Sequence, residues 1–389
     1  MTDPTQPAAT ESRLALTDFA RGIAALLVAA FHATALLSKP KYFAVDPTQG
    51  FFQFGSRGVD FFFVLSGFII AYVHWFDLGK PNRLRAYSLK RAIRIYLPLW
   101  VVAVPYILAC FLMNADILPP GWSPRLEQVF GSLTLMPTRE LPLPTVVWTL
   151  KHEMLFYILF AVILWRPRIG AALFALGGLL CLYHATIGFA SNFLVDFFCS
   201  VYNLEFILGV GCGIYARNAK VPYPVAFAML GLVLFAYAAV DYREPEFVAR
   251  WLANTSTLWQ ATKFGVSSAL IILGLSQIDR STSVKVPPAL ALLGSASYAI
   301  YLVHAPAMTF SCKALMVAGR YVPLSPWLAF GILMAIGVST GIAFHFFIEM
   351  PLVRCARRWA FVRRVQPPNK QTEAPQLATA EASPSPPGA

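Results

Sequence analysis

Residues 14–37 read LALTDFARGIAALLVAAFHATALL, and this stretch decides how the rest of the chain is interpreted. It is long enough to cross the hydrocarbon core of a bilayer, which takes about 20 apolar residues in a helix. It carries an arginine near its start, Arg21, and a histidine deep inside, His32. Their spacing corresponds to about three helical turns, so both project from one face, about 16 Å apart along the axis. The sequence therefore predicts a helix with one polar face that runs from a membrane surface into the membrane interior.

Both ionisable residues have two interpretations. A charge at membrane depth costs at least about 2.5 kcal/mol and usually faces a bundle interior or a water-filled cavity. Arg21 is either a functional residue or an anchor whose charge stays at the cytoplasmic surface. His32 is either a core histidine with satisfied hydrogen bonds or a catalytic base, because imidazole moves protons near neutral pH. For His32 we favour the catalytic interpretation.

The composition is that of a membrane protein. The chain has 389 residues, 57% of them hydrophobic and only 13% charged, whereas soluble domains have about 25% charged residues. The formal net charge of +12 comes from basic residues that fall in loops between apolar runs. This charge therefore reports membrane topology and not a nucleic-acid partner. Six scattered cysteines show no metal-ligand spacing, so we expect neither a disulfide framework nor a metal site.

Apolar runs of about 20 residues, separated by polar, Pro or Gly breaks, occur ten times along the chain. They lie at 14–37, 58–77, 93–113, 146–165, 169–187, 203–216, 222–240, 258–275, 290–312 and 325–348. Lys and Arg concentrate in the loops that an N-in, C-in arrangement places in the cytoplasm, in agreement with the positive-inside rule. The sequence thus predicts an all-α polytopic membrane protein with about ten transmembrane helices and both termini in the cytoplasm.

The remaining segments are short. Residues 1–13 lack the features of a signal peptide and are expected to be a cytoplasmic N-terminus. Residues 366–389 are rich in Pro, Ala and Ser, which predicts a disordered cytoplasmic tail. Residues 14–365 then form the transmembrane domain. The loop at 114–146 is either a lid over the outer mouth or a plain connector.

Two arginines lie one helical turn apart in KRAIRIYLP, where the third span enters the membrane from the cytoplasmic side. Arg91 and Arg94 have the spacing of a clamp that binds phosphate through charge-assisted hydrogen bonds. They also have the position of ordinary positive-inside anchors. Both interpretations remain open on these residues alone.

The fourth span begins with WTLKHEMLFY, which places His152 and Glu153 near its outer end. A carboxylate there must be paired or hydrated. Glu153 shares a helix face with Tyr157, one turn later, whereas His152 is turned about 100° away. We expect Glu153 to orient or charge-stabilise a histidine, or to take a proton from a hydroxyl group.

Several other polar or small residues lie inside the spans. Ser66 and Gly67 are expected to allow close helix packing, and His345 and Glu349 to make a local contact four residues apart. The remaining candidates are Asp60, Tyr301 and His304.

In order along the chain, these motifs closely resemble the membrane-bound acyltransferase-3 family, which includes bacterial O-antigen and exopolysaccharide acetylases. The matching segments are TDFARGIAALLVAAFH, GVDFFFVLSGF, KRAIRIYLP, WTLKHEMLFY, SYAIYLVH and IEMP. The resemblance implies a ten-span protein that moves an acyl group, usually acetyl from cytoplasmic acetyl-CoA, to a hydroxyl of an extracytoplasmic glycan. It also implies that the family's motif residues correspond by position to Arg21, His32, Arg91, Arg94 and Glu153. Met154 stands where many members have a second acidic residue, which puts any paired-carboxylate mechanism in doubt.

We therefore predict a membrane-bound O-acyltransferase of the bacterial inner membrane. His32, Glu153 and Arg21 are the expected catalytic residues, and Arg91 and Arg94 are expected to bind the donor, acetyl-CoA, with no metal. The expected partners are an acyl-CoA, a glycan or lipid-linked glycan acceptor and the lipid bilayer, without nucleic acid. The acceptor hydroxyl, the acyl group, an acyl-histidine intermediate and the oligomeric state are left open.

Two alternatives come from other classes of protein. Buried His and Glu residues also suit proton coupling in a secondary transporter or a glycan or lipid flippase. The chain shows no repeat between its halves of the kind that many transporters have. A non-catalytic partner in polysaccharide export is the second alternative, and the intact donor-binding residues disfavour it.

Overall fold

The structure is a computed structural model that describes residues 14–112, 125–188, 192–240, 242, 258–319 and 324–362. Within these ranges every regular element is a helix. In chain order the elements are α1 (Ala15–Leu37), η1 (Phe51–Arg57), α2 (Gly58–Val73), η2 (Trp75–Asp77), α3 (Pro81–Leu112), α4 (Leu126–Thr134), η3 (Thr145–Val147), α5 (Trp148–Trp165), α6 (Pro167–Thr186), α7 (Phe193–Phe198), α8 (Val201–Asn218), α9 (Pro224–Val240), α11 (Leu258–Ser281), α12 (Pro288–Gly319), α13 (Pro326–Phe344), η4 (His345–Glu349) and α14 (Met350–Val362). Residues 1–13 and the predicted tail at 366–389 lie outside the described residues, as does part of the 114–146 loop.

The described residues confirm the predicted all-α, multi-pass membrane architecture. They contain nine helical segments that are long and apolar enough to cross a membrane, and α9 is a shorter apolar helix of 17 residues. Each of the ten predicted spans corresponds to one of these segments. The placement of both termini in the cytoplasm stays a prediction.

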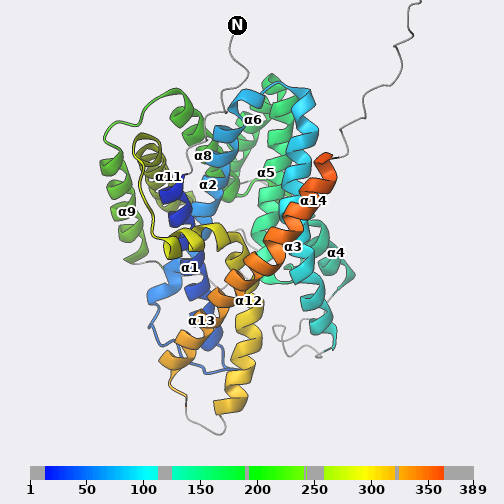
Figure 1. Ribbon diagram of the computed structural model, residues 1–389, viewed down its shortest axis with the longest axis vertical. Coiled ribbons are helices and arrows are strands. Elements are labelled where there is room, and N and C mark those ends of the chain that lie inside the picture. Colours follow the sequence, from blue (N-terminus) through cyan, green and yellow to red (C-terminus); the bar gives the residue numbers. More distant parts are fainter. Residues whose placement is uncertain are drawn as a thin grey trace, which may run out of the picture.

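Some helices extend well beyond the apolar runs that predicted them. The third span was predicted from residue 93, but α3 already begins at Pro81. Its polar first turns carry the basic residues that the sequence analysis placed in a loop. The last span continues through the π-helical turn η4 into α14, which packs against α3 (Figure 1). Hydropathy marks the apolar part of a helix and not its ends, because a helix can continue into the aqueous phase.

Helix α1 lies inside the bundle and packs against α2, α11, α12 and α13 (Figure 1). Its contact with α12 is closest at two glycines. A Cβ atom added at Gly22 would lie 2.8 Å from the carbonyl carbon of Leu293, and one at Gly294 would lie 2.4 Å from the carbonyl oxygen of Asp18. Glycines at these positions therefore let the two backbones approach each other, as small residues do in membrane helices.

A glycine also allows close approach of the α2 and α8 backbones. A Cβ atom at Gly67 would lie 2.2 Å from the carbonyl oxygen of Phe206. This contact confirms the packing role predicted for Gly67. The predicted local contact at the end of the last span is also confirmed, because His345 Nδ1 lies 2.7 Å from Glu349 Oε2 within η4.

We predict that Gly294→Ala destabilises the protein because the new methyl group would overlap the α1 backbone. Overpacking of this kind typically costs about 1–3 kcal/mol. A lower melting temperature of the purified protein in detergent is the expected result. Gly331→Ala in α13 is the matched control, because a Cβ atom there meets nothing within 4 Å. Equal melting temperatures for the two variants would show that the α1–α12 contact is looser than described.

Candidate active site

One cavity brings together four of the five residues that the sequence analysis assigned to the site. It has a volume of about 110 Å³ and is lined by α1, α2, α3, α5 and α12. Arg21, Arg91, Arg94 and Glu153 all contribute to its wall. The sequence analysis placed the arginines toward the cytoplasmic surface and Glu153 near the outer end of its span. That separation is wrong, because residues around one small cavity cannot lie at opposite membrane surfaces.

The three arginines of the cavity differ in how their charge is compensated. Arg21 donates a hydrogen bond of 2.7 Å from Nη2 to the carbonyl oxygen of Gly294 and forms an ion pair of 3.4 Å with Asp18. The guanidinium of Arg91 lies 5.2 Å from the centre of the Tyr157 ring. No carboxylate among the described residues forms an ion pair with Arg91 or with Arg94. The α3 side of the cavity therefore carries positive charge that favours an anionic ligand.

Glu153 is held by two hydroxyl groups. Its Oε1 accepts a hydrogen bond from Tyr157 Oη and one of 3.1 Å from Ser66 Oγ. Ser66 was expected only to allow close packing, and its contact with Glu153 across the cavity corrects that expectation. Both hydrogen bonds reach the same carboxylate oxygen, which leaves Oε2 without a hydrogen bond among the described residues.

His32 lies beside a second histidine and is not among the residues that line the cavity. Its Nδ1 is 2.9 Å from the carbonyl oxygen of Val28 and 3.2 Å from Nε2 of His304. Nδ1 of His304 is 2.9 Å from the carbonyl oxygen of Ile300. These contacts assign the proton of each neutral ring to Nδ1, since a carbonyl oxygen can only accept. Nε2 of His32 is then the nitrogen that can take up a proton.

Tyr301 connects this histidine pair with the cavity. It lines the cavity, its ring centre lies 6.0 Å from that of His304, and its hydroxyl is 2.8 Å from Thr149 Oγ1. Tyr301 and His304 were candidates in the sequence without a predicted role. Their spacing of three residues, which places both on one face of a helix, is the signal that could have linked them.

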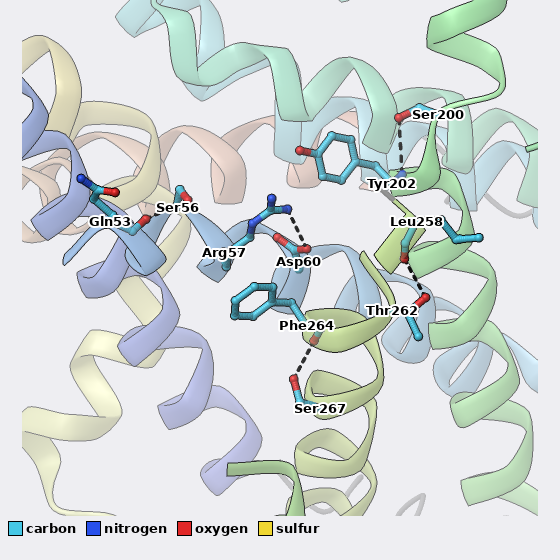
Figure 2. Close-up of polar contacts among 10 residues, drawn as sticks. All are labelled: Gln53, Ser56, Arg57, Asp60, Ser200, Tyr202, Leu258, Thr262, Phe264 and Ser267. Atoms are coloured by element: carbon cyan, nitrogen blue, oxygen red, sulfur yellow. Dashed lines mark hydrogen bonds and ion pairs between the residues drawn. The ribbon is translucent and has the colours of Figure 1, made fainter. Parts of the chain in front are cut away.

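Two other ionisable candidates lie away from the cavity wall. His152 stacks on Phe197 with ring centres 4.3 Å apart, and its Nδ1 is 3.2 Å from Asn203 Oδ1. It therefore faces an aromatic cluster, as its rotation away from Glu153 predicted. Asp60 is fully buried in α2 and lies 3.4 Å from Nη1 of Arg57, in the ion pair that Figure 2 shows beside Phe264 of α11.

Comparisons with known proteins identify the family of this chain. Residues 16–345 match the acyltransferase domain that defines the membrane-bound acyltransferase-3 family. The chain therefore belongs to this family. The exopolysaccharide production protein ExoZ of Rhizobium meliloti (strain 1021) is 29% identical over 324 residues, which cover 81% of this chain and 95% of that protein. No solved structure matches the chain. In the part of the chain that the structure describes, no group of His, Cys, Asp or Glu side chains is arranged to hold a metal ion.

We predict that Glu153→Gln removes most of the acyl-transfer activity while leaving the melting temperature nearly unchanged. Glutamine keeps the shape of the side chain and an oxygen acceptor, but it removes the negative charge from the cavity. His152→Ala should have the opposite profile, since it empties a space in the aromatic cluster without touching the cavity. Transfer rates and melting temperatures of both purified variants test this. An active Glu153→Gln protein beside an inactive, stable His152→Ala protein would contradict the assignment.

Proposed function

We propose that this protein is an O-acyltransferase that moves an acetyl group from cytoplasmic acetyl-CoA to a hydroxyl group of a cell-surface or exported glycan, in the bacterial inner membrane. The observation that carries the proposal is the layout of the site. One cavity has, on its α3 side, arginines that form no ion pair with a described residue, and its wall includes Tyr301, which lies beside a histidine pair. An anionic donor and a hydroxyl acceptor need these two environments. The name of the relative ExoZ, an exopolysaccharide production protein, supports a glycan as the acceptor.

The cavity size supports a short acyl group. Pockets that enclose a whole drug-sized ligand have volumes of about 300–1,000 Å³, whereas this cavity has about 110 Å³. It therefore admits only a few non-hydrogen atoms, such as the acetyl end of a thioester. The nucleotide end of the donor has to stay outside, where Arg91 and Arg94 can contact its phosphates.

In the proposed reaction, Nε2 of His32 takes the proton from the acceptor hydroxyl. The hydroxyl oxygen attacks the carbonyl carbon of the thioester, the carbon–sulfur bond breaks, and the leaving thiolate takes the proton from the His32 imidazolium. The products are the acetyl ester and free CoA. Arg21 lines the cavity about three helical turns from His32, and its charge contacts the donor there. His304 positions His32 by accepting from its Nδ1, and Glu153 orients the groups that enter the cavity.

We predict that His32→Ala abolishes transfer of labelled acetyl from acetyl-CoA to the glycan, while the amount of protein in the membrane stays the same. Removing the base leaves the hydroxyl group without a proton acceptor. His184→Ala is a suitable control, since His184 pairs with Asp196 at the end of α6, 3.0 Å away. Wild-type turnover in the His32→Ala protein would overturn this role.

The same assay separates the remaining classes of function. A transporter or flippase would leave acetyl-CoA intact, and label that stays on the protein without an acceptor would indicate a covalent acyl-histidine. Comparing the mass of the surface polysaccharide of a deletion strain with that of the wild type identifies the acyl group and the class of acceptor.

We also predict that acetyl-CoA is a better donor than butyryl-CoA because the cavity limits the acyl group. Ile69→Ala should reduce this preference, since Ile69 lines the cavity and its truncation enlarges it. Ile158→Ala, on an exposed face of α5, is the control and should leave the preference unchanged. The ratio of kcat/KM values for the two donors is the measurement. A preference for butyryl-CoA in the wild type would contradict the size argument.

A further inference from the structure

A third arginine lies outside the cavity, close to the two on α3. Helix α14 packs against α3 and crosses it in Figure 1. Arg357 is exposed on α14, and the charges that act on it most strongly are those of Arg94 and Arg91. The π-helical turn η4 that precedes α14 also contacts α3. Two segments from distant parts of the sequence thus place three arginines on packed helices, where their charges act on one another.

No described carboxylate forms an ion pair with any of these three arginines, although two of them line the cavity. In the same bundle, Arg21 has an acidic partner in Asp18 and Arg57 in Asp60. Arg91, Arg94 and Arg357 have no ion pair among the described residues, and their charges repel one another. Such a cluster is stabilised by an anion, and the planar guanidinium fork matches the oxygens of a phosphate group.

We propose that Arg357 completes, with Arg91 and Arg94, a binding site for the phosphate groups of a nucleotide-containing thioester donor. The inference rests on the proposed function for the identity of the donor. Phosphate could also come from a lipid headgroup. The connection to the cavity favours the donor, because Arg91 and Arg94 line the cavity whereas Arg357 lies beyond it. A ligand whose acyl end fills the cavity would extend past these two residues and place its phosphates within reach of Arg357.

The first experiment measures binding without any transfer. Adenosine 3′,5′-bisphosphate, which carries phosphates of the CoA nucleotide, is titrated by calorimetry into purified protein in neutral detergent. Arg357→Gln should weaken its binding about tenfold, the typical effect of losing one charge-assisted contact. Arg358→Gln removes the same charge one residue further along α14, about 100° around the helix, and should have no effect. Equal affinities for the wild type and Arg357→Gln would overturn the proposal.

The second experiment identifies the source of the phosphate. Arg357→Gln should raise the KM for acetyl-CoA about tenfold and leave the KM for acetyl-pantetheine, which lacks the nucleotide, unchanged. If the arginines instead hold a lipid, the variant would retain less phosphatidylglycerol after purification and bind the bisphosphate as the wild type does, which overturns the proposal. Failure of the proposed function looks different: the wild type would bind the bisphosphate but transfer acetyl from neither donor.

Discussion

The close packing of α1 against α12 is the contact on which the site depends. Gly22 and Gly294 allow the two backbones to meet. At this level the guanidinium of Arg21 reaches the carbonyl oxygen of Gly294, and further along the same interface His32 meets His304. Both ends of the proposed reaction path are therefore set by one helix–helix contact. A small change in the spacing or rotation of these helices would displace both.

The protein compensates its buried charges in different ways. These differences distinguish charged residues with a structural role from those with a functional one. Arg57 and Asp60 neutralise each other in a buried ion pair. Glu153 accepts hydrogen bonds from two hydroxyl groups, those of Ser66 and Tyr157. Arg91 and Arg94 form no ion pair with any described carboxylate, a costly arrangement in an apolar bundle unless an anion binds there. A charge inside the membrane is thus a weaker indicator of function than a charge that the protein itself leaves uncompensated.

Much of the architecture could be predicted from the sequence because it depends on local patterns. The length of an apolar run fixes whether a helix can cross the membrane, and all ten predicted runs correspond to helices. The spacing of Arg21 and His32 predicts that both lie on one face of the helix. In the structure both side chains face α12. The same rule placed Glu153 and His152 on different sides of α5. The order of the motifs also identified the family before any contact was known.

Those local patterns do not predict the contacts between helices. The partnership of Glu153 with Ser66, the pairing of His32 with His304, and the approach of Arg357 to the α3 arginines depend on how each helix is shifted and rotated against its neighbours. Glycine contacts and the π-helical turn set these shifts, and no periodicity in a single segment encodes them. The sequence by itself determined which residues lie on which face of which helix. Only the tertiary structure decided which faces meet, because helix packing joins residues that are far apart in the chain.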